Sequence, residues 1–346
     1  MSDALDTESP VSRELPAERQ LLLTMDRTSQ PPSPEHALLV SFYFGEEAGA
    51  GDDPAIVDTG LHPLADGPRY ENWWYRGAVA HRIVGDCRIA ECDDYAIVTL
   101  QLPDAPAAEF RELSYEAYRA LLEAVASTGK QQLIRIWNYF PHINEGSGDA
   151  EKYRQFSIGR AEAFAEVDFG VSGIPAGTAT GCVEGGPFSI VALVSSNEFR
   201  AVENPRQVSA YEYPRQYGPK SPQFSRGATV AADDHLLYLI SGTAAVVGHE
   251  SAHPYDTERQ IGETVENLKH IGNKLSDGVA GLPHFALDDE CVLRVYVRSP
   301  EDYALVLDRL GSALGHPVTE GDNVVFLRSD ICRRELMVEV DGTRCF

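Results

Sequence analysis

The stretch Tyr238-Leu-Ile-Ser-Gly-Thr-Ala-Ala-Val-Val-Gly248 begins the unit from which the fold is predicted. Its apolar start predicts a strand over 236–240, which ends at the Ser-Gly turn. The segment that follows, Asp256-Thr-Glu-Arg-Gln-Ile-Gly-Glu-Thr-Val-Glu-Asn-Leu268, predicts a long helix over about 255–275. The remaining expected elements of this half are a helix over 300–314 and strands over 291–297, 323–327 and 335–340.

The first half of the chain shows the same order of elements. A helix is expected over 114–126, because Tyr118, Leu121, Leu122 and Val125 recur at helical spacing, Ser114 can cap the start and Gly129 can end it. A second helix is expected over about 150–166. Strands are expected over 37–44, 76–84, 86–92, 94–100, 132–138 and 188–194.

This repeated alternation predicts an α/β fold with mixed sheets and helices packed on one face. The predicted domains are residues 36–200 and 201–346. Residues 1–35 are polar and rich in proline, so they are predicted to form a flexible arm. A chain of 346 residues is long enough for two such cores.

Composition excludes several classes of partner. The net charge of −24 argues against binding to nucleic acid, which needs accumulated positive charge. No apolar run approaches the roughly 20 residues of a membrane helix, and the acidic N-terminus lacks the features of a secretion signal. We therefore expect a cytoplasmic protein without membrane contact. The six cysteines form no C-x-x-C pair, the histidines are dispersed, and no cofactor motif is legible, so neither a metal nor a cofactor is expected.

Three segments carry a resemblance to a known family. They are Ile136-Trp-Asn-Tyr-Phe-Pro-His-Ile-Asn144, Tyr153-Arg-Gln-Phe-Ser-Ile-Gly-Arg160 and Asn204-Pro-Arg-Gln-Val-Ser-Ala-Tyr-Glu-Tyr-Pro-Arg-Gln-Tyr-Gly-Pro219, and they resemble the chorismatases. The strand, Ser-Gly turn and helix of 238–268, with the later segments 293–303 and 336–341, resemble the RidA/YjgF fold family. The resemblance covers about residues 37–342 and implies two RidA/YjgF-like (chorismate-mutase-like) domains.

The resemblance implies an activity on a small molecule, chorismate. Chorismatases release pyruvate and leave 3-hydroxybenzoate, a mixture of 3- and 4-hydroxybenzoate, or a dihydroxycyclohexadiene acid. This chain is most similar to the branch that forms both hydroxybenzoates, whose products would feed ubiquinone or an aryl-polyene pigment. The resemblance leaves two assemblies open, a monomer and a homotrimer.

The chemistry of chorismate sets what the site must contain. Breaking its enol ether requires a proton at the enolpyruvyl methylene carbon, and its two carboxylates require cations in the same pocket. Glu339 is the expected acid, because it stands where the RidA-like pattern places a glutamate, whereas the corresponding strand over 188–194 has no carboxylate. Burial would keep this acid protonated. Glu335 is the competing candidate.

The expected anion clamp is built from arginine, whose planar fork matches a carboxylate. Because six residues correspond to about 600° of helical turn, two arginines at that spacing on one helix cannot share one face tightly. The candidates are Arg154 and Arg160 on the helix over 150–166, and Arg206 and Arg215 in the segment between the halves.

Aromatic and small residues complete the expected site. Tyr213 and Tyr217 flank Arg215 and offer a ring face and a hydroxyl, and the backbone N–H of Gly218 could approach an anion closely. In the family that the chain resembles, the residues corresponding to Ala245 and Cys332 help to decide between hydrolysis and ring-oxygen rearrangement. Cys332 could assist as a thiol or could simply pack as a small apolar group.

Two other classes of function stay open at this point. Simple RidA proteins deaminate reactive imines, and the same fold could also serve as a non-catalytic ligand-binding protein. The deaminase alternative does not need the Arg- and Tyr-rich segment over 204–226, and the binding-protein alternative would be unaffected by Glu339→Gln.

Overall fold

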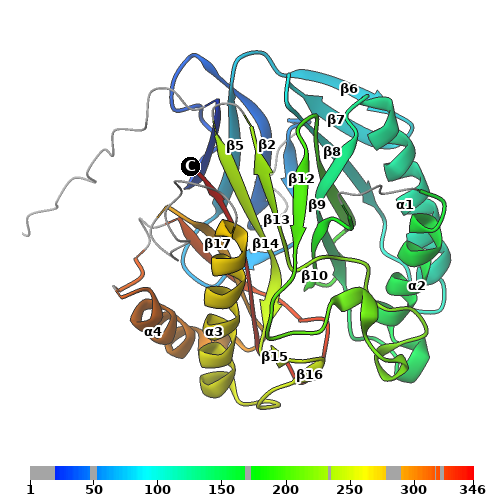
Figure 1. Cartoon of the computed structure of the whole chain (residues 1–346), viewed down its shortest axis with the longest axis vertical. Coiled ribbons are helices and arrows are strands. Elements are labelled where there is room, and N and C mark those ends of the chain that lie inside the picture. The colour runs from blue at the N-terminus through cyan, green and yellow to red at the C-terminus, as the bar shows by residue number, and fades with distance from the viewer. Residues whose placement is uncertain are drawn as a thin grey trace, which may run out of the picture.

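The computed structural model describes residues 20–46, 53–167, 173–232, 235–277, 290–315, 317–319 and 323–346. Sheets occupy the middle of the molecule, with helices α1 (Phe110–Ser127) and α2 (Lys152–Phe164) on one side and α3 (Thr257–Ser276) and α4 (Tyr303–Leu314) on another (Figure 1). The predicted mixed α/β fold is confirmed. No described helix has the length and apolar character needed to cross a membrane.

The first large sheet has six strands, and α1 and α2 cover one of its faces. Its order is β10-β9-β11-β8-β7-β6. Buried apolar side chains of α1, α2 and this sheet form one continuous core, which includes Tyr118, Phe140 and Phe156. The bounds are Ala80–Val84 for β6, Cys87–Glu91 for β7, Tyr95–Leu102 for β8, Gln132–Pro141 for β9, Ala176–Cys182 for β10 and Phe188–Ser195 for β11.

The second large sheet has seven strands and is covered by α3 and α4. Its order is β12-β13-β14-β19-β17-β18-β4. A separate core joins it to the two helices and includes Ile261, Leu268 and Val340. The bounds are His62–Pro63 for β4, Phe199–Val202 for β12, Gly227–Ala231 for β13, Leu236–Ala244 for β14, Val292–Val297 for β17, Val324–Arg328 for β18 and Val338–Cys345 for β19.

The two sheets repeat one topology. Read from β18 to β12, the second sheet has the order β18-β17-β19-β14-β13-β12, which corresponds strand by strand to the order β10-β9-β11-β8-β7-β6 of the first sheet. Corresponding strands also follow one another in the same order along the chain. The parallel pair β9–β10 corresponds to the parallel pair β17–β18. Strand β11, which has no carboxylate, therefore corresponds to β19, which carries Glu339. Because β12 begins at Phe199, the second sheet starts just before residue 201, and we propose the domain boundary there.

A third sheet, formed by the N-terminal segment, has no counterpart among the described strands of the second repeat. It consists of β1 (Leu21–Asp26), β2 (His36–Phe44), β3 (Ile56–Asp58) and β5 (Arg69–Arg76), in the order β1-β5-β2-β3. Its apolar side chains enter a central core that also contains residues of both large sheets.

The prediction of a flexible arm over 1–35 is wrong for its second part. Leu21, Leu23 and Met25 alternate with more exposed residues and are buried, so β1 pairs along β5 as an ordinary strand. The proline-rich composition after β1 concealed this short alternation. Residues 1–19 of the predicted arm lie outside the described part of the chain.

The boundaries of other predicted elements also move, including those of α1 and β19. Helix α1 begins at Phe110, whose ring packs on Phe140 and Phe188, so Ser114 is buried inside the helix and does not cap it. Strand β19 begins at Val338, not at residue 335, and Glu335 lies in the preceding turn.

Candidate active site

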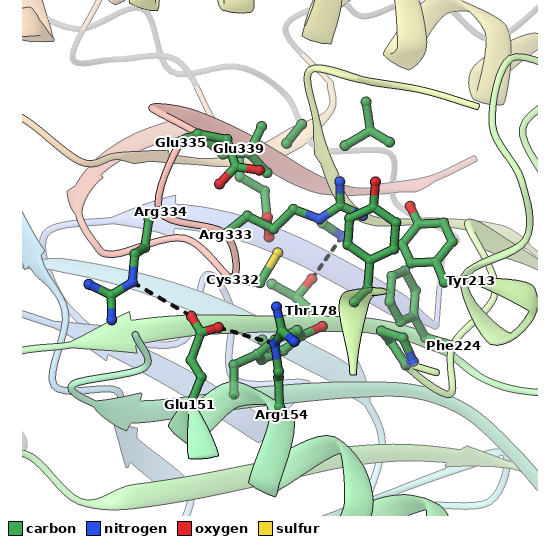
Figure 2. Close-up of a pocket in the computed structure, with 18 of the residues that line it drawn as sticks. Glu151, Arg154, Thr178, Tyr213, Phe224, Cys332, Arg333, Arg334, Glu335 and Glu339 are labelled. Carbon is green, nitrogen blue, oxygen red and sulfur yellow. Dashed lines mark hydrogen bonds and ion pairs between the residues drawn. The ribbon is translucent and has the colours of Figure 1, made fainter. Parts of the chain in front are cut away.

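A cavity of about 520 Å³ lies where the two repeats meet. Its wall combines residues of α2 and β10 from the first repeat with residues of β14 and β19 and their flanking loops from the second (Figure 2). The lining includes five arginines and three glutamates, Arg154, Arg160, Arg226, Arg333, Arg334, Glu151, Glu335 and Glu339. The cavity is therefore locally cationic although the chain carries a net charge of −24.

Glu339 is the one glutamate of the cavity lining that is buried among the described residues. Its side chain is only 4% exposed. Burial, and secondly the neighbouring carboxylate of Asp341, raise the pKa of Glu339 to about 8, while Arg135 and Arg226 act in the opposite direction. Within the described part of the chain, no group donates a hydrogen bond to its carboxyl. Glu339 is therefore protonated at neutral pH and has its proton free for a ligand.

The Ser-Gly turn of the sequence forms the floor beneath Glu339. It is an irregularity in β14, where the pairing with β19 shifts between Ile240 and Thr243. The Ser241 hydroxyl accepts a hydrogen bond from the Gly177 N–H at 2.9 Å, and the Gly242 N–H donates to Thr178 Oγ1 at 3.0 Å. The turn thus joins β14 of the second repeat to β10 of the first. Gly242 has no side chain, and the Glu339 carboxyl occupies the space that a Cβ would need.

Two buried arginines, one from each repeat, line the cavity. Arg160 on α2 is 2% exposed, and its guanidinium lies over the Phe156 ring at 4.8 Å. Arg226, just before β13, lies near the rings of Tyr213 and Phe224 and donates to the Tyr213 hydroxyl at 2.6 Å. Neither arginine forms an ion pair with a carboxylate among the described residues. A buried cation without a counter-ion is a place for an anionic ligand.

A third arginine, Arg333, lies over the aromatic wall. Its guanidinium is 3.9 Å from the centre of the Tyr217 ring and 5.1 Å from that of Tyr213. It donates to the His249 carbonyl and the Ser251 hydroxyl, and it too has no ion pair within the described ranges. These contacts fix the position of the cation and leave its charge unpaired.

The remaining two arginines share one carboxylate. Glu151 lies between Arg154, at 3.3 Å, and Arg334, at 4.0 Å (Figure 2). Arg154 is also 3.7 Å from Asp149. Arg154 and Arg160 both reach the cavity although they are six residues apart on α2, because long side chains on neighbouring faces can converge. Arg154 is the more neutralised of the two.

Four residues expected at the site do not line the cavity. Arg206 pairs with Glu263 and Asn267 on α3. Arg215 is 64% exposed and pairs with Asp149 at 2.5 Å. Gly218 lies against the Arg154 side chain, and Ala245 is fully buried between Ala244 and Val246, which do line the cavity. The other predicted residues at the cavity are Glu339, Cys332, Arg154, Arg160, Tyr213 and Tyr217.

Cys332 and Glu335 reach the cavity from the turn before β19. Burial, followed by the nearby Glu339, raises the pKa of the Cys332 thiol to about 12, so it carries its proton at neutral pH. The Glu335 carboxyl accepts a hydrogen bond from the Ser251 hydroxyl at 2.7 Å. Glu335 is therefore tied to the wall, whereas Glu339 is not.

Several lining residues were not anticipated from the sequence, namely Arg226, Arg333, Arg334, Thr178, Phe224 and Glu151. Arg226 ends the Arg- and Tyr-rich segment over 204–226, and Arg333 directly follows Cys332. These two arginines could have been identified from the sequence because they adjoin residues already predicted at the site.

Comparison with known proteins gives a consistent result. Residues 71–194 match the family model described as chorismatase FkbO/Hyg5-like, N-terminal. A 3-hydroxybenzoate synthase of Streptomyces hygroscopicus is 35% identical over 247 residues, 68% of this chain and 70% of the relative. A chorismatase of Streptomyces rapamycinicus is 32% identical over 258 residues, 73% and 75% of the two chains. A crystal structure of a chorismatase superposes with a TM-score of 0.79 at 25% identity, over 94% of this chain and 98% of that one. With this sequence similarity, and with a buried acid in a cationic cavity between two repeats, the chain belongs to the chorismatase family.

Proposed function

We propose that this enzyme cleaves the enolpyruvyl ether of chorismate and releases pyruvate. The observation that carries the proposal is the raised pKa of Glu339 in a cavity where Arg160, Arg226 and Arg333 form no ion pair with the described residues. Chorismate matches both features, since it offers two carboxylates to the cations and a vinyl-ether carbon to the acid. The names of the similar relatives support the same substrate.

Glu339 starts the reaction by giving its proton to the methylene carbon of the enolpyruvyl group. A C–H bond forms, the Glu339 carboxylate is left behind, and positive charge develops on the ether carbon. In hydrolysis, water attacks that carbon, the hemiketal collapses, and the bond between that carbon and the ether oxygen breaks, so that the ring keeps the oxygen and pyruvate leaves. In the rearrangement, the oxygen of the neighbouring ring hydroxyl attacks the ring carbon that bears the ether, the bond between this carbon and the ether oxygen breaks, and pyruvate leaves with that oxygen. The epoxide formed in this way then opens to the hydroxybenzoate. The proton lost from the attacking oxygen returns to Glu339, which restores the acid. No external oxidant or reductant is needed.

The arginines hold the two carboxylates and set the orientation of the substrate. Arg226 and Arg333 surround the aromatic wall of Tyr213 and Tyr217, and Arg160 faces the cavity from the opposite repeat. Charge-assisted hydrogen bonds of this kind are stronger than neutral ones, and donors fixed in position keep their geometry through the reaction. The aromatic rings offer apolar faces to the six-carbon ring.

The ring product that we propose is 3-hydroxybenzoate, alone or with 4-hydroxybenzoate, which would feed ubiquinone or an aryl-polyene pigment. The support is the similarity to a 3-hydroxybenzoate synthase and the protonated Cys332 thiol at the cavity. A neutral thiol can pack against a reactive intermediate without adding charge, which favours capture by a ring oxygen over water. The alternative product is the dihydroxycyclohexadiene acid formed by hydrolysis.

Product analysis tests the proposed function. Purified protein is incubated with chorismate, pyruvate is measured with lactate dehydrogenase, and the ring acids are separated by chromatography. We expect pyruvate and hydroxybenzoate in equal amounts. Absence of enzyme-dependent pyruvate, with release of ammonia from a reactive imino acid, would instead identify an imine deaminase. Chorismate binding without turnover would identify a binding protein.

A further inference from the structure

A second carboxylate, that of Asp341, lies behind Glu339 in the same buried layer. The two residues are two positions apart on β19, so their side chains leave the strand on the same face. Asp341 is 2% exposed. Its Oδ2 atom accepts hydrogen bonds from Thr178 Oγ1 at 2.8 Å, Arg135 Nη2 at 3.0 Å and the Tyr296 hydroxyl at 3.1 Å. The donors come from three strands, β10, β9 and β17.

We propose that Asp341 is a positioning residue whose fixed negative charge keeps the proton on Glu339. This inference rests on the proposed function, in which Glu339 acts as the acid. All three donors face the one oxygen of Asp341, and one of them, Arg135, forms an ion pair with it. Ionisation of Glu339 would then place a second negative charge beside that of Asp341 in a buried site. Repulsion between like charges is strong in a buried site, so the ionisation of Glu339 is disfavoured.

Thr178 links this charge to the position of the acid. Its hydroxyl donates to Asp341, and its oxygen accepts from Arg135 Nη2 at 2.6 Å and from the Gly242 N–H at 3.0 Å. A hydroxyl offers one donor and two acceptor sites, so all of them are used. Gly242 is the floor on which the Glu339 carboxyl rests. One hydrogen-bond network thus sets both the charge behind Glu339 and the surface beneath it.

The other groups around Glu339 do not supply this effect. Arg135 and Arg226 favour loss of its proton, and among its electrostatic neighbours Asp341 has the largest influence. The thiol and the phenols near Glu339 are neutral at physiological pH. The titratable and charged groups facing Glu339 from the surrounding elements are Asp341 on β19, Arg135 on β9, Arg226 before β13, Tyr153 on α2, Tyr296 on β17 and Cys332 before β19.

The direct test is a titration of the carboxyl groups by NMR on protein labelled with ¹³C at the Glu and Asp side chains, with the Glu339 signal assigned from the E339Q variant. In the unaltered protein we expect Glu339 to be protonated at neutral pH while Asp341 is charged. In Asp341→Asn the pKa of Glu339 should fall by about one unit or more, the size expected when a neighbouring like charge is removed. Arg135→Gln should shift it in the opposite direction.

The rate of pyruvate release gives the second readout. Asp341→Asn should work at close to the normal rate in mildly acidic buffer and lose activity at a lower pH than the unaltered enzyme. A residue with only a structural role would lower the rate equally at every pH. Asp104→Asn is the matched control, because it breaks the partly buried Asp104–Lys152 ion pair outside the cavity and should leave the pH profile in place.

The outcomes separate this inference from the proposed function. A proton found on Asp341 instead of Glu339, or a pH profile unmoved in Asp341→Asn, would overturn the inference while leaving the activity intact. Absence of pyruvate release from the unaltered protein would overturn the function, and the titration would still show which carboxyl holds the proton. Because that titration needs only the unaltered protein and its E339Q variant, a failure of Asp341→Asn to fold does not prevent the test.

Discussion

The carboxyl group of Glu339 rests on the α-carbon of Gly242, in the space where any side chain at position 242 would stand. Two strands of the second repeat, β19 and β14, bring the acid and the glycine together, and Thr178 of the first repeat holds the glycine from below. The position of the reacting proton therefore depends on a contact that only glycine permits.

Gly242→Ala should disable the enzyme without unfolding it. The backbone of Gly242 does not adopt the left-handed conformation, so alanine brings no backbone strain there. Its methyl group would displace the Glu339 carboxyl, and a displacement of about 1 Å can cost about 100-fold in rate. The measurement is pyruvate release beside a thermal melt. Gly262→Ala, on α3 with open space around it, is the control and should keep full activity. Normal turnover by Gly242→Ala would contradict the assigned contact.

Arg160→Gln should weaken chorismate binding. Arg160 is a buried cation without an ion pair in the described part of the chain, and losing one charged hydrogen bond costs about 1.5–3 kcal/mol, or roughly 10- to 150-fold in affinity. Arg215→Gln is the matched control, because Arg215 is exposed and outside the cavity. Calorimetric titration with chorismate in a Glu339→Gln background measures both. Equal affinities for the two variants would exclude Arg160 from the clamp.

Cys332→Ala should change the ratio of ring products more than the rate of pyruvate release. The thiol is protonated at neutral pH, so it does not act as a nucleophile before the ether bond breaks. The Cys332 side chain shapes the part of the cavity in which the cationic intermediate of the reaction is captured. Chromatography of the products at full conversion measures the ratio, and slow alkylation by iodoacetamide at neutral pH checks the protonation state. An unchanged ratio would assign Cys332 to packing alone.

The raised pKa of Glu339 also predicts how stability depends on pH. The folded state keeps this proton up to about pH 8, whereas the ordinary pKa of the group is 4.5. The free energy of unfolding therefore falls as pH rises from the ordinary pKa of the group through its pKa in the folded protein, because the folded state binds this proton more tightly than the unfolded state and must give it up. Glu339→Gln removes this cost and should be more stable than the unaltered protein above pH 8, by on the order of a few kcal/mol. Urea unfolding at several pH values measures the difference, which should vanish in acid.

The fold was predictable where periodic patterns are long. The helices of both repeats and the strands that flank them follow from apolar spacing, and Glu339 was identified because it stands where the RidA-like pattern places a glutamate. The N-terminal sheet was not predictable in this way. Strands β3 and β4 have only three and two residues, and β1 is identified as a strand by pairing with β5, about 50 residues away.

The site was predictable only in part, because it is assembled by long-range contacts. Arg226 and Arg333 are separated by more than 100 residues and meet around Tyr213. Arg206 and Arg215 lie in the same motif-bearing segment, but one turns toward α3 and the other toward solvent. The sequence shows which residues share a segment near the site. The direction in which each side chain points depends on the residues that pack beside it, and these are distant in the sequence.

The most direct test of the account is turnover and binding by Glu339→Gln. Glutamine keeps the shape of the side chain and cannot donate a carboxylic proton, so we expect pyruvate release to fall to background while chorismate binds with an affinity close to that of the unaltered enzyme. Pyruvate release at the normal rate by this variant would contradict the account, because the proton would then come from another group.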